Sequence, residues 1–384
     1  MRVVISWIKI FAKSIFAKPE IKLTLSCFFI TRTLLTLIGV TSRIILESHR
    51  GRGRSDVLKN VWLDIWGVWD TGWYLNIAQN WYTTDINSHG GANYGFFPLY
   101  PFLMRIVGWF VQNNYIGGII VSNVALLVSC IFLYRLVERE ASSEIALNSI
   151  KFLFLFPTAF IFSAVFSESL FVACMLGSFY FARGNRWFWA GFFGGLTALT
   201  RSIGVFVCLP LFYEYIHSKD FKIANVRVDV LCLSLVPIGL SLFAFLNYRL
   251  TGDFLAFSHI QQTGWKHEWT NPFSVLLGSL VDGDPLHFLN GLFSITAVVV
   301  LSAGIRTIGF SFWLMGMILL FFPPLAGKVC MNSMLRYGLV VFPFYLMFAR
   351  ISENPIWYWM LVIILTILQG VLMVYWTNGY HLII

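Results

Sequence analysis

A carboxylate among aromatic side chains is the feature of this sequence that most directly suggests chemistry. Asp70 lies in WGVWDTGWY, residues 66–74, between hydrophobic regions of the chain, with Trp69, Trp73 and Tyr74 as near neighbours. Aromatic rings of this kind favour a membrane–water boundary, because one part of the ring is apolar and another is polar. A carboxylate there can accept the proton of an attacking hydroxyl, which is general-base catalysis. The alternative is that Asp70 caps a short helix over residues 71–81.

Two further charged residues interrupt apolar runs. Glu168 lies in FSESLF and Arg201 lies in ALTRSIG. Charged residues in or near a bilayer are costly and indicate a function. We expect Arg201 to bind an anion, either a carboxylate such as Glu168 or a phosphate. The alternatives are a polar hairpin turn for Glu168 and an extended side chain that reaches the interface for Arg201.

The segment NYGFFPLYP, residues 93–101, combines aromatic residues with two prolines. Pro98 and Pro101 predict a shaped turn over Phe96–Pro101 in place of regular helix. Irregular backbone at membrane depth is tolerated where it is buried in protein or lines a cavity. Phe97 and Tyr100 are therefore candidates for substrate contacts, and an aromatic belt followed by a helix is the alternative.

Later loops add cationic and acidic candidates. Lys266 and His267 lie in TGWKHEW, and Arg336 with Tyr337 lies in NSMLRYG. These are candidate phosphate- or substrate-binding residues, with interfacial anchoring as the alternative. Asp282 and Asp284 flank Gly283 and are weak candidates for a divalent metal, although Asp-Gly-Asp is also an ordinary turn sequence. We expect no metal cofactor. Asp64 and Asp85 lack a setting comparable to that of Asp70.

The composition predicts a membrane protein. Hydrophobic residues make up 58% and charged residues 12% of the 384 residues, and mean hydropathy is +0.74. Soluble proteins carry about 25% charged residues. We therefore expect one all-α, polytopic membrane domain over residues 1–384, with about eleven transmembrane helices. The apolar runs are near 24–46, 117–137, 150–166, 168–183, 188–200, 202–216, 229–249, 287–304, 308–326, 337–350 and 356–376.

Charge placement predicts the topology. Residues 1–22 read as a basic helix lying in the interface, and lysines and arginines of later loops place the N-terminus inside. Loops 47–95 and 251–286, with short interfacial helices, then share the outer face with the connection 328–336. The net charge of +9 is scattered, so we expect lipid-headgroup contact and no nucleic-acid binding. The six cysteines lack a metal or disulfide pattern.

Four motifs in this order carry a family resemblance: WDTGWYLNIA, FFPLYP, FPTAFIFSAVFSESLF and ALTRSIG. Together they resemble the GPI mannosyltransferase 2 (PIG-V) family and its bacterial relatives, over about residues 60 to 345. The resemblance implies a GT-C integral membrane glycosyltransferase that uses a polyprenyl-phosphate sugar, with inversion at the anomeric carbon. It also implies that Asp70 matches the family's acidic residue in the first outer loop. The chain is shorter than the eukaryotic members.

The resulting hypothesis is a hexosyltransferase, with mannose as the expected sugar. It would act on a lipid or glycan acceptor at the outer face of a bacterial plasma membrane. Asp70 would be the base, and Arg201, Arg336 or Lys266 would stabilise the phosphate leaving group. A transporter or flippase for lipids or lipid-linked sugars, with Glu168 and Arg201 as a gate, is the alternative. A scaffolding subunit is a third possibility.

Overall fold

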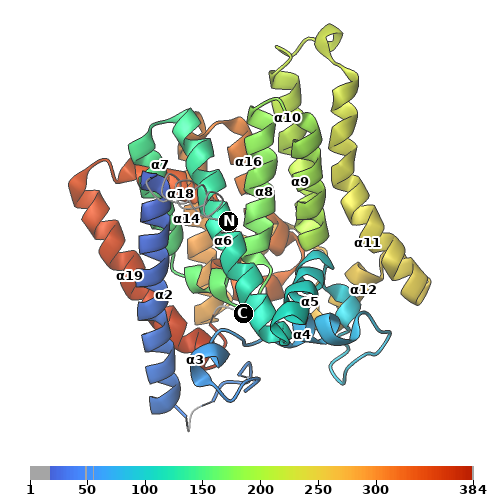
Figure 1. Ribbon diagram of the computed structural model, residues 1–384, viewed down its shortest axis with the longest axis vertical. Coiled ribbons are helices and arrows are strands. Elements are labelled where there is room, and N and C mark those ends of the chain that lie inside the picture. The colour runs from blue at the N-terminus through green and yellow to red at the C-terminus, as the bar shows by residue number, and fades with distance from the viewer. Residues whose placement is uncertain (1–17, 48–49, 55, 383–384) are drawn as a thin grey trace, which may run out of the picture.

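The computed structural model describes residues 18–47, 50–54 and 56–382, and its regular elements are helices (Figure 1). In this part of the chain no β-strand is formed, and a single isolated bridge pairs Ile86 with Ala92. The all-α membrane bundle predicted from the composition is confirmed. Residues 1–17 of the expected interfacial helix lie outside the described residues, and residues 19–22 form the first turn of α2.

Five described helical segments are long and apolar enough to cross a membrane. The bent pair Lys328–Gly338 and Pro343–Ile351 makes a sixth if it counts as one span. The five segments are α2 (Pro19–Ile45), α6 (Asn114–Glu140), η5 with α11 (Val228–Ser234 and Leu235–Thr251), α14 (Pro285–Ala303) and α19 (Pro355–Thr377).

The other apolar runs of the sequence form shorter helices. They are α7 (Ser143–Leu155), α8 (Glu168–Arg183), α9 (Trp187–Thr200), η3 with α10 (Ser202–Val207 and Cys208–His217), α16 (Phe310–Leu325) and α18 (Pro343–Ile351). Side chains at several helix starts satisfy free backbone N–H groups. Asn113 caps α6, Ser142 caps α7 and Asn354 caps α19.

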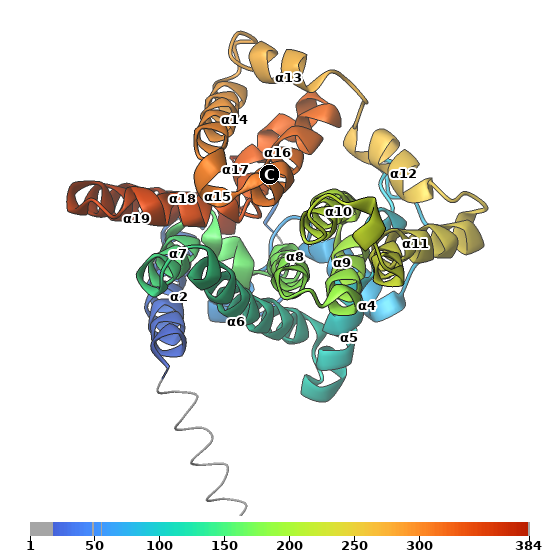
Figure 2. The same ribbon diagram turned by 90° about the horizontal axis from the view of Figure 1, so that it is seen from above.

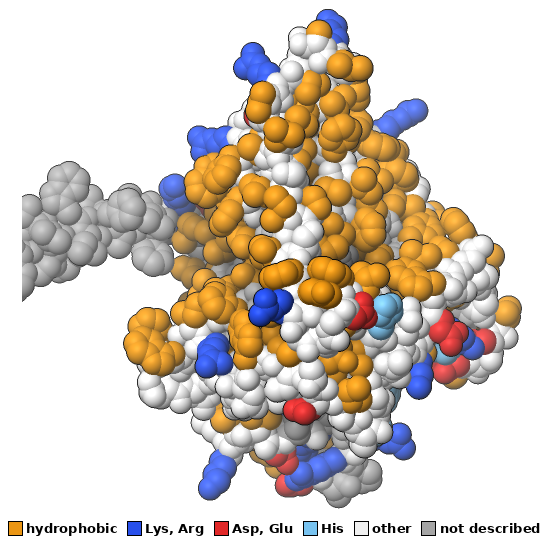
Figure 3. Space-filling model, turned by 90° about the vertical axis from the view of Figure 1, so that its right-hand side faces the viewer, with side chains coloured by type: hydrophobic (Ala, Val, Ile, Leu, Met, Phe, Trp, Pro, Cys, Tyr) orange, Lys and Arg blue, Asp and Glu red, His pale blue; other side chains and the backbone are white. Residues whose placement is uncertain are grey.

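The outer surface of the bundle is apolar, as contact with lipid requires. On α19, Ile356, Trp359, Ile363 and Ile367 recur at helical spacing and are 56–77% exposed. Hydrophobic side chains cover the upper part of one face, while most acidic side chains in view lie in its lower part (Figure 3). Acidic groups in this view are therefore concentrated towards one end of the molecule, whereas Lys and Arg side chains occur at both ends.

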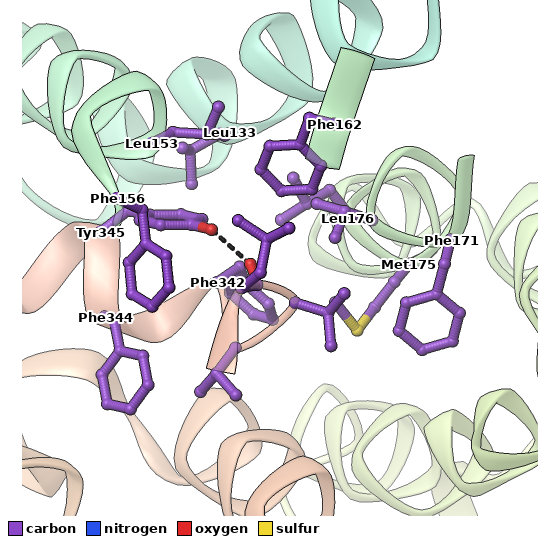
Figure 4. Close-up of a cluster of buried hydrophobic side chains, with 14 of the residues drawn as sticks. Leu133, Leu153, Phe156, Phe162, Phe171, Met175, Leu176, Phe342, Phe344 and Tyr345 are labelled. Atoms are coloured by element: carbon purple, nitrogen blue, oxygen red, sulfur yellow. Dashed lines mark hydrogen bonds between the residues drawn. The ribbon is translucent and has the colours of Figure 1, made fainter. Parts of the chain in front are cut away.

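The interior is filled by aromatic and aliphatic side chains from α7, α8, α18 and the segment between α7 and α8. That segment contains η2 (Ala159–Ser163), whose residues are all buried. Phe156, Phe344 and Tyr345 pack together, and the Tyr345 hydroxyl donates to the carbonyl of Leu339 (Figure 4). Burial in protein explains how this irregular backbone is accommodated within the bundle.

Small residues let α9 and α11 approach closely. A Cβ at Gly195 would lie 2.7 Å from the Leu235 carbonyl oxygen, and one at Gly239 would lie 2.4 Å from the Gly195 carbonyl oxygen. Close contact through small residues is typical of helices packed in membranes. It fixes α9, whose last turn leads to Arg201, against a neighbouring helix.

Three connections meet at one end of the bundle. The first, between α2 and α5 (Leu99–Val111), carries α3 (Val61–Asp64), α4 (Thr71–Asn80) and η1 (Asn93–Gly95). The second carries α12 (Ala256–Trp265) and α13 (Pro272–Gly278), which run along the edge from α11 to α14 (Figure 2). The third contains η6 (Lys328–Ser333) and α17 (Met334–Gly338). The Glu268 N–H donates to the Ala326 carbonyl at 3.0 Å, which joins the second connection to the third.

The predicted turn over Phe96–Pro101 is only partly correct. Phe96 is extended and Pro98 is the N-cap residue, but α5 already begins at Leu99 and includes Pro101. The first turn of a helix has no intrahelical partners for its N–H groups, so proline is tolerated there. The prolines therefore mark a helix start.

Candidate active site

Four charged side chains from distant parts of the sequence form one cluster, here called the charged cluster: Asp70, Glu168, Arg201 and Arg336. Arg336 Nη1 lies 3.0 Å from Asp70 Oδ2, and its Nε lies 3.4 Å from Glu168 Oε1. Arg201 Nη1 donates to the same Glu168 oxygen at 2.7 Å. The predicted pairing of Arg201 with a carboxylate is confirmed. Glu168 thus lies between two arginines, and one of these also holds Asp70.

Burial divides the charged cluster into an inner and an outer part. The side chains of Glu168 and Arg336 are 1% and 8% exposed, whereas those of Asp70 and Arg201 are each 20% exposed. A carboxylate as buried as Glu168 requires a charged partner, and it has two. Asp70 and Arg201 are the members that a molecule from outside reaches most easily.

The backbone around Asp70 is shaped for this position. Trp69 has φ +53°, a left-handed conformation that is uncommon for a bulky residue. Its N–H donates to the Gly53 carbonyl at 2.9 Å, and its ring lies 4.5 Å from that of His381. Strained residues of this kind are often found beside functional sites. Trp69 therefore links the first connection to the C-terminal segment directly before Asp70.

Asp70 occupies the N-cap position of α4, but its side chain makes no capping hydrogen bond. The helix expected over residues 71–81 is present as Thr71–Asn80. Because the carboxylate turns to Arg336, the capping role considered for it is not realised. Glu168 is the first residue of α8, where the helix dipole favours a negative charge.

Aromatic rings lie on the three connections at this end of the molecule. Trp73 stacks on Phe96 with ring centres 5.6 Å apart, and Trp265 lies 5.6 Å from Trp73 and 5.5 Å from Phe96. All three rings are half-buried. The guanidiniums of Arg336 and Arg201 lie 5.4 and 5.9 Å from the Tyr337 ring, a favourable cation–π arrangement.

Tyr74, Phe97 and Tyr100 are interior residues. The Tyr74 hydroxyl lies 3.0 Å from Ser167 Oγ, next to Glu168. Phe97 packs on Phe243 at 4.5 Å, and Tyr100 is fully buried with its hydroxyl 2.8 Å from Ser122 Oγ. All three side chains are packed among other buried residues, and their contact with a substrate stays a prediction.

Lys266 and His267 follow Trp265 on the second connection. Lys266 is exposed with φ +58°, and no described carboxylate lies within ion-pair distance of it. His267 is half-buried, and its Nε2 lies 3.6 Å from Cys330 Sγ on the third connection. Burial lowers the pKa of the His267 imidazole, so the neutral form is favoured. Neither residue makes a hydrogen bond or ion pair with the charged cluster.

Asp282 and Asp284 form a turn and a helix cap. The Asp284 side chain accepts from the Leu286 N–H at the start of α14 at 2.8 Å. Asp282 accepts from the Asp284 N–H, and lies 2.7 Å from His287 Nδ1 and 3.1 Å from Lys328 Nζ. These hydrogen bonds, that of the Asp284 N–H foremost, lower the pKa of Asp282 to about 2. Among the described residues, no group of three or more His, Cys, Asp or Glu is placed to hold a metal ion.

One buried ion pair was not predicted. Arg43 of α2 binds the Asp64 carboxylate, and both side chains are at most 2% exposed. The other Asp64 oxygen accepts from the N–H groups of Val57 and Leu58 at 2.8 and 2.7 Å, and Arg43 Nε donates to the Thr377 carbonyl. Asp64 therefore has a structural setting of its own, which fastens the first connection to α2 and α19.

Comparison with solved structures supports the fold. No family model and no curated protein sequence matches the chain. ArnT from Cupriavidus metallidurans, solved with undecaprenyl phosphate, aligns with a TM-score of 0.55 at 13% identity, over 87% of this chain and 62% of ArnT. The Archaeoglobus fulgidus oligosaccharyltransferase aligns with a TM-score of 0.48 at 12% identity, over 96% of this chain and 56% of that protein.

The ArnT alignment shows that the chain shares the helical membrane fold of ArnT. The chain spans less than two thirds of the length of either structure. At this identity the likeness concerns the fold alone, and function must be argued from the site.

Proposed function

We propose that the chain is a GT-C-type glycosyltransferase related to the PIG-V family. It would transfer a hexose, with mannose as the best candidate, from a polyprenyl-phosphate donor to a hydroxyl of a lipid or glycan acceptor. The observation that carries the proposal is the contact between Asp70 and Arg336 in the charged cluster. It places a reachable carboxylate beside the cations that a leaving phosphate requires.

The reaction follows from these positions. The acceptor oxygen attacks C1 of the sugar, the bond from C1 to the phosphate oxygen breaks, and its electron pair stays on the polyprenyl phosphate. Asp70 takes the proton of the acceptor hydroxyl. Arg201 and Arg336 stabilise the charge on the leaving phosphate by fixed positive charge. Attack opposite to the leaving group inverts the anomeric carbon.

Arg336 serves two partners in turn. In the structure the Asp70 carboxylate is engaged by the Arg336 guanidinium at 3.0 Å. When the donor phosphate binds Arg336, Asp70 loses this partner and becomes available to the acceptor. Glu168 keeps Arg336 in place throughout, because it is buried and also binds Arg201.

The half-buried rings of Trp73, Phe96 and Trp265 supply apolar faces for the sugar or the first isoprene units. Lys266, next to Trp265, is exposed and without a described ion-pair partner, so it can meet a donor or acceptor that approaches from outside. The polyprenyl chain would lie in the surrounding lipid. We place the site at the outer face of a bacterial plasma membrane, with basic connections such as residues 218–227 at the opposite end.

The proposal requires no metal. A phosphate monoester carries about two negative charges, which two guanidiniums can match. Activity should therefore persist in the presence of a chelator. Loss of activity with chelator and its return with Mn²⁺ or Mg²⁺ would bring Asp282 and Asp284 back as metal ligands.

The proposal is tested by a transfer assay in detergent with radiolabelled polyprenyl-phosphate mannose and a total lipid extract. Wild-type protein should form a labelled product whose identity reveals the acceptor, and Asp70→Ala protein of the same thermal stability should form none. Counterflow of a lipid-linked sugar in liposomes without a covalent product would instead support the transporter. Full activity of the Asp70→Ala protein would contradict the role of Asp70.

A further inference from the structure

The hairpin of residues 218–227, here called the 218–227 hairpin, lies at the end of the bundle opposite to the charged cluster (Figure 1). It connects α10, which ends at His217, to η5, which begins at Val228, and contains the short helix η4 (Ile223–Asn225). The proposed transfer reaction uses none of its residues.

A buried tyrosine holds the base of this hairpin. The Tyr215 hydroxyl accepts from the Arg227 N–H at 2.9 Å and lies 2.6 Å from an oxygen of Asp229. The Asn225 side chain donates to the Lys219 carbonyl at 3.2 Å. Two consecutive residues, Asp220 and Phe221, have φ values of +54° and +55°. Left-handed conformations are unfavourable for such side chains, so the shape of the turn is imposed by the contacts around it.

The hairpin forms a hollow of about 420 Å³ that is open to the outside. It is lined by Ser218, Lys219, Ala224, Asn225 and Arg227. Its two cations, Lys219 and Arg227, have no carboxylate within ion-pair distance among the described residues. The Asp229 carboxylate is engaged by Tyr215, and Asp220 does not line the hollow. The Lys219 ammonium lies 5.2 Å from the Tyr215 ring, and neither cation has a carboxylate partner in the described part of the chain. Two such cations at one hollow form a site for an anion.

The rim of the hollow indicates which anion it binds. Phe221, Ile223 and Val228 are 58%, 88% and 79% exposed, and the candidate membrane span Val228–Thr251 begins at this point. Side chains that combine apolar and basic character at the end of a span fit the boundary between acyl chains and headgroups. A binding site for a free anion in water would not require this apolar rim.

We propose that the 218–227 hairpin binds the headgroup phosphate of an anionic phospholipid. Lys219 and Arg227 hold the phosphate in the hollow, while Phe221 and Ile223 insert beside the acyl chains. Lys222 provides a matched control, because it is an exposed cation of the same hairpin that does not line the hollow. The site is independent of the proposed transfer reaction.

The test measures phosphatidylglycerol binding to the full chain in nanodiscs of phosphatidylcholine, by native mass spectrometry over a range of phosphatidylglycerol content. Lys219→Gln and Arg227→Gln should each weaken retention by about tenfold, as expected for the loss of one charge-assisted contact, whereas Lys222→Gln should leave it within about twofold. Thermal unfolding verifies that each variant is folded, and Arg227→Lys should restore part of the binding.

Equal effects of all three substitutions would overturn the proposal in favour of diffuse attraction, and unchanged retention in all three would overturn it outright. A parallel titration with inorganic phosphate distinguishes the lipid from a free anion. If inorganic phosphate displaced phosphatidylglycerol completely, the hollow would be a free-anion site and the lipid assignment would be wrong.

Discussion

In the proposed reaction, Asp70 and the donor phosphate compete for Arg336, and this competition predicts how an Asp70 variant binds the donor. Asp70→Asn should bind polyprenyl phosphate more tightly than the wild-type protein, although it should lose transfer activity. In the wild-type protein, the phosphate must displace a carboxylate that lies 3.0 Å from the Arg336 guanidinium. Asparagine removes the competing charge and the repulsion between carboxylate and phosphate.

The size of the gain follows from the contact. A hydrogen bond between charged groups contributes about 1.5–3 kcal/mol, and one with a neutral acceptor about 0.5–1.5 kcal/mol. Asparagine retains a neutral acceptor, so the expected gain is the difference between the two ranges, about 1–1.5 kcal/mol. This corresponds to roughly a five- to tenfold lower Kd for polyprenyl phosphate.

The assay is equilibrium binding of radiolabelled polyprenyl phosphate to purified protein in detergent. Asp85→Asn is the matched control, because Asp85 is an exposed carboxylate of the same connection, and its Kd should equal that of the wild type. In an Arg336→Gln background, Asp70→Asn should no longer improve binding, since the shared partner is gone. Unchanged or weaker binding by Asp70→Asn, or an equal gain from Asp85→Asn, would refute the reasoning.

Three further predictions concern other parts of the site. Glu168→Gln removes the buried counter-ion of two arginines and should destabilise the fold by about 3–5 kcal/mol. The control Glu353→Gln breaks an exposed ion pair and should cost less than about 1 kcal/mol. Thermal unfolding measures both losses of stability. Trp265→Ala should raise KM for the donor by about three- to tenfold through the loss of an aromatic contact, with kcat little changed in steady-state assays; a fall in kcat alone would contradict a binding role. The Asp282 pKa of about 2 lies below its ordinary value of 3.8, so its stabilising effect is present above pH 4 and is lost as the pH falls towards 2. The difference in Tm between wild type and Asp282→Asn should accordingly be constant at neutral pH and shrink below pH 4.

The sequence was informative where a charged residue stood in an apolar setting. Glu168 and Arg201 were recognised in this way, and their 2.7 Å contact confirms the predicted pairing. The contact of Asp70 with Arg336, which lies 266 residues away, was not predicted. Arg201, Arg336 and Lys266 were all candidate cations for the site, and a single sequence does not show which of them the fold brings next to Asp70.

Helix ends within apolar runs were the harder problem. The run 150–166 was expected to be a membrane segment, either by itself or as half of a helical hairpin with 168–183. Instead, α7 ends at Leu155 and irregular buried backbone follows. Pro157 was the available signal, because a proline disfavours helical geometry in the residue before it. Phe156 is indeed extended, with ψ +139°.

Trp265 was missed because no local pattern distinguishes it from other loop tryptophans. Trp269, four residues later, is 61% exposed and packs near Phe322, whereas Trp265 meets Trp73 and Phe96. The difference arises from the docking of α12 beside η1, where Gln261 Nε2 donates to the Gly95 carbonyl at 3.3 Å. Such a contact between connections exists only in the folded chain.

The central claim is that Asp70 acts as the base in sugar transfer, and the most direct test is a single-turnover measurement on Asp70→Asn protein saturated with labelled polyprenyl-phosphate mannose. Saturation removes any effect of donor affinity, so the rate reports the chemical step. We predict a rate at least about 10²-fold below that of the wild type, as expected for loss of a general base, with thermal stability retained. Wild-type turnover by the folded Asp70→Asn protein would contradict the account.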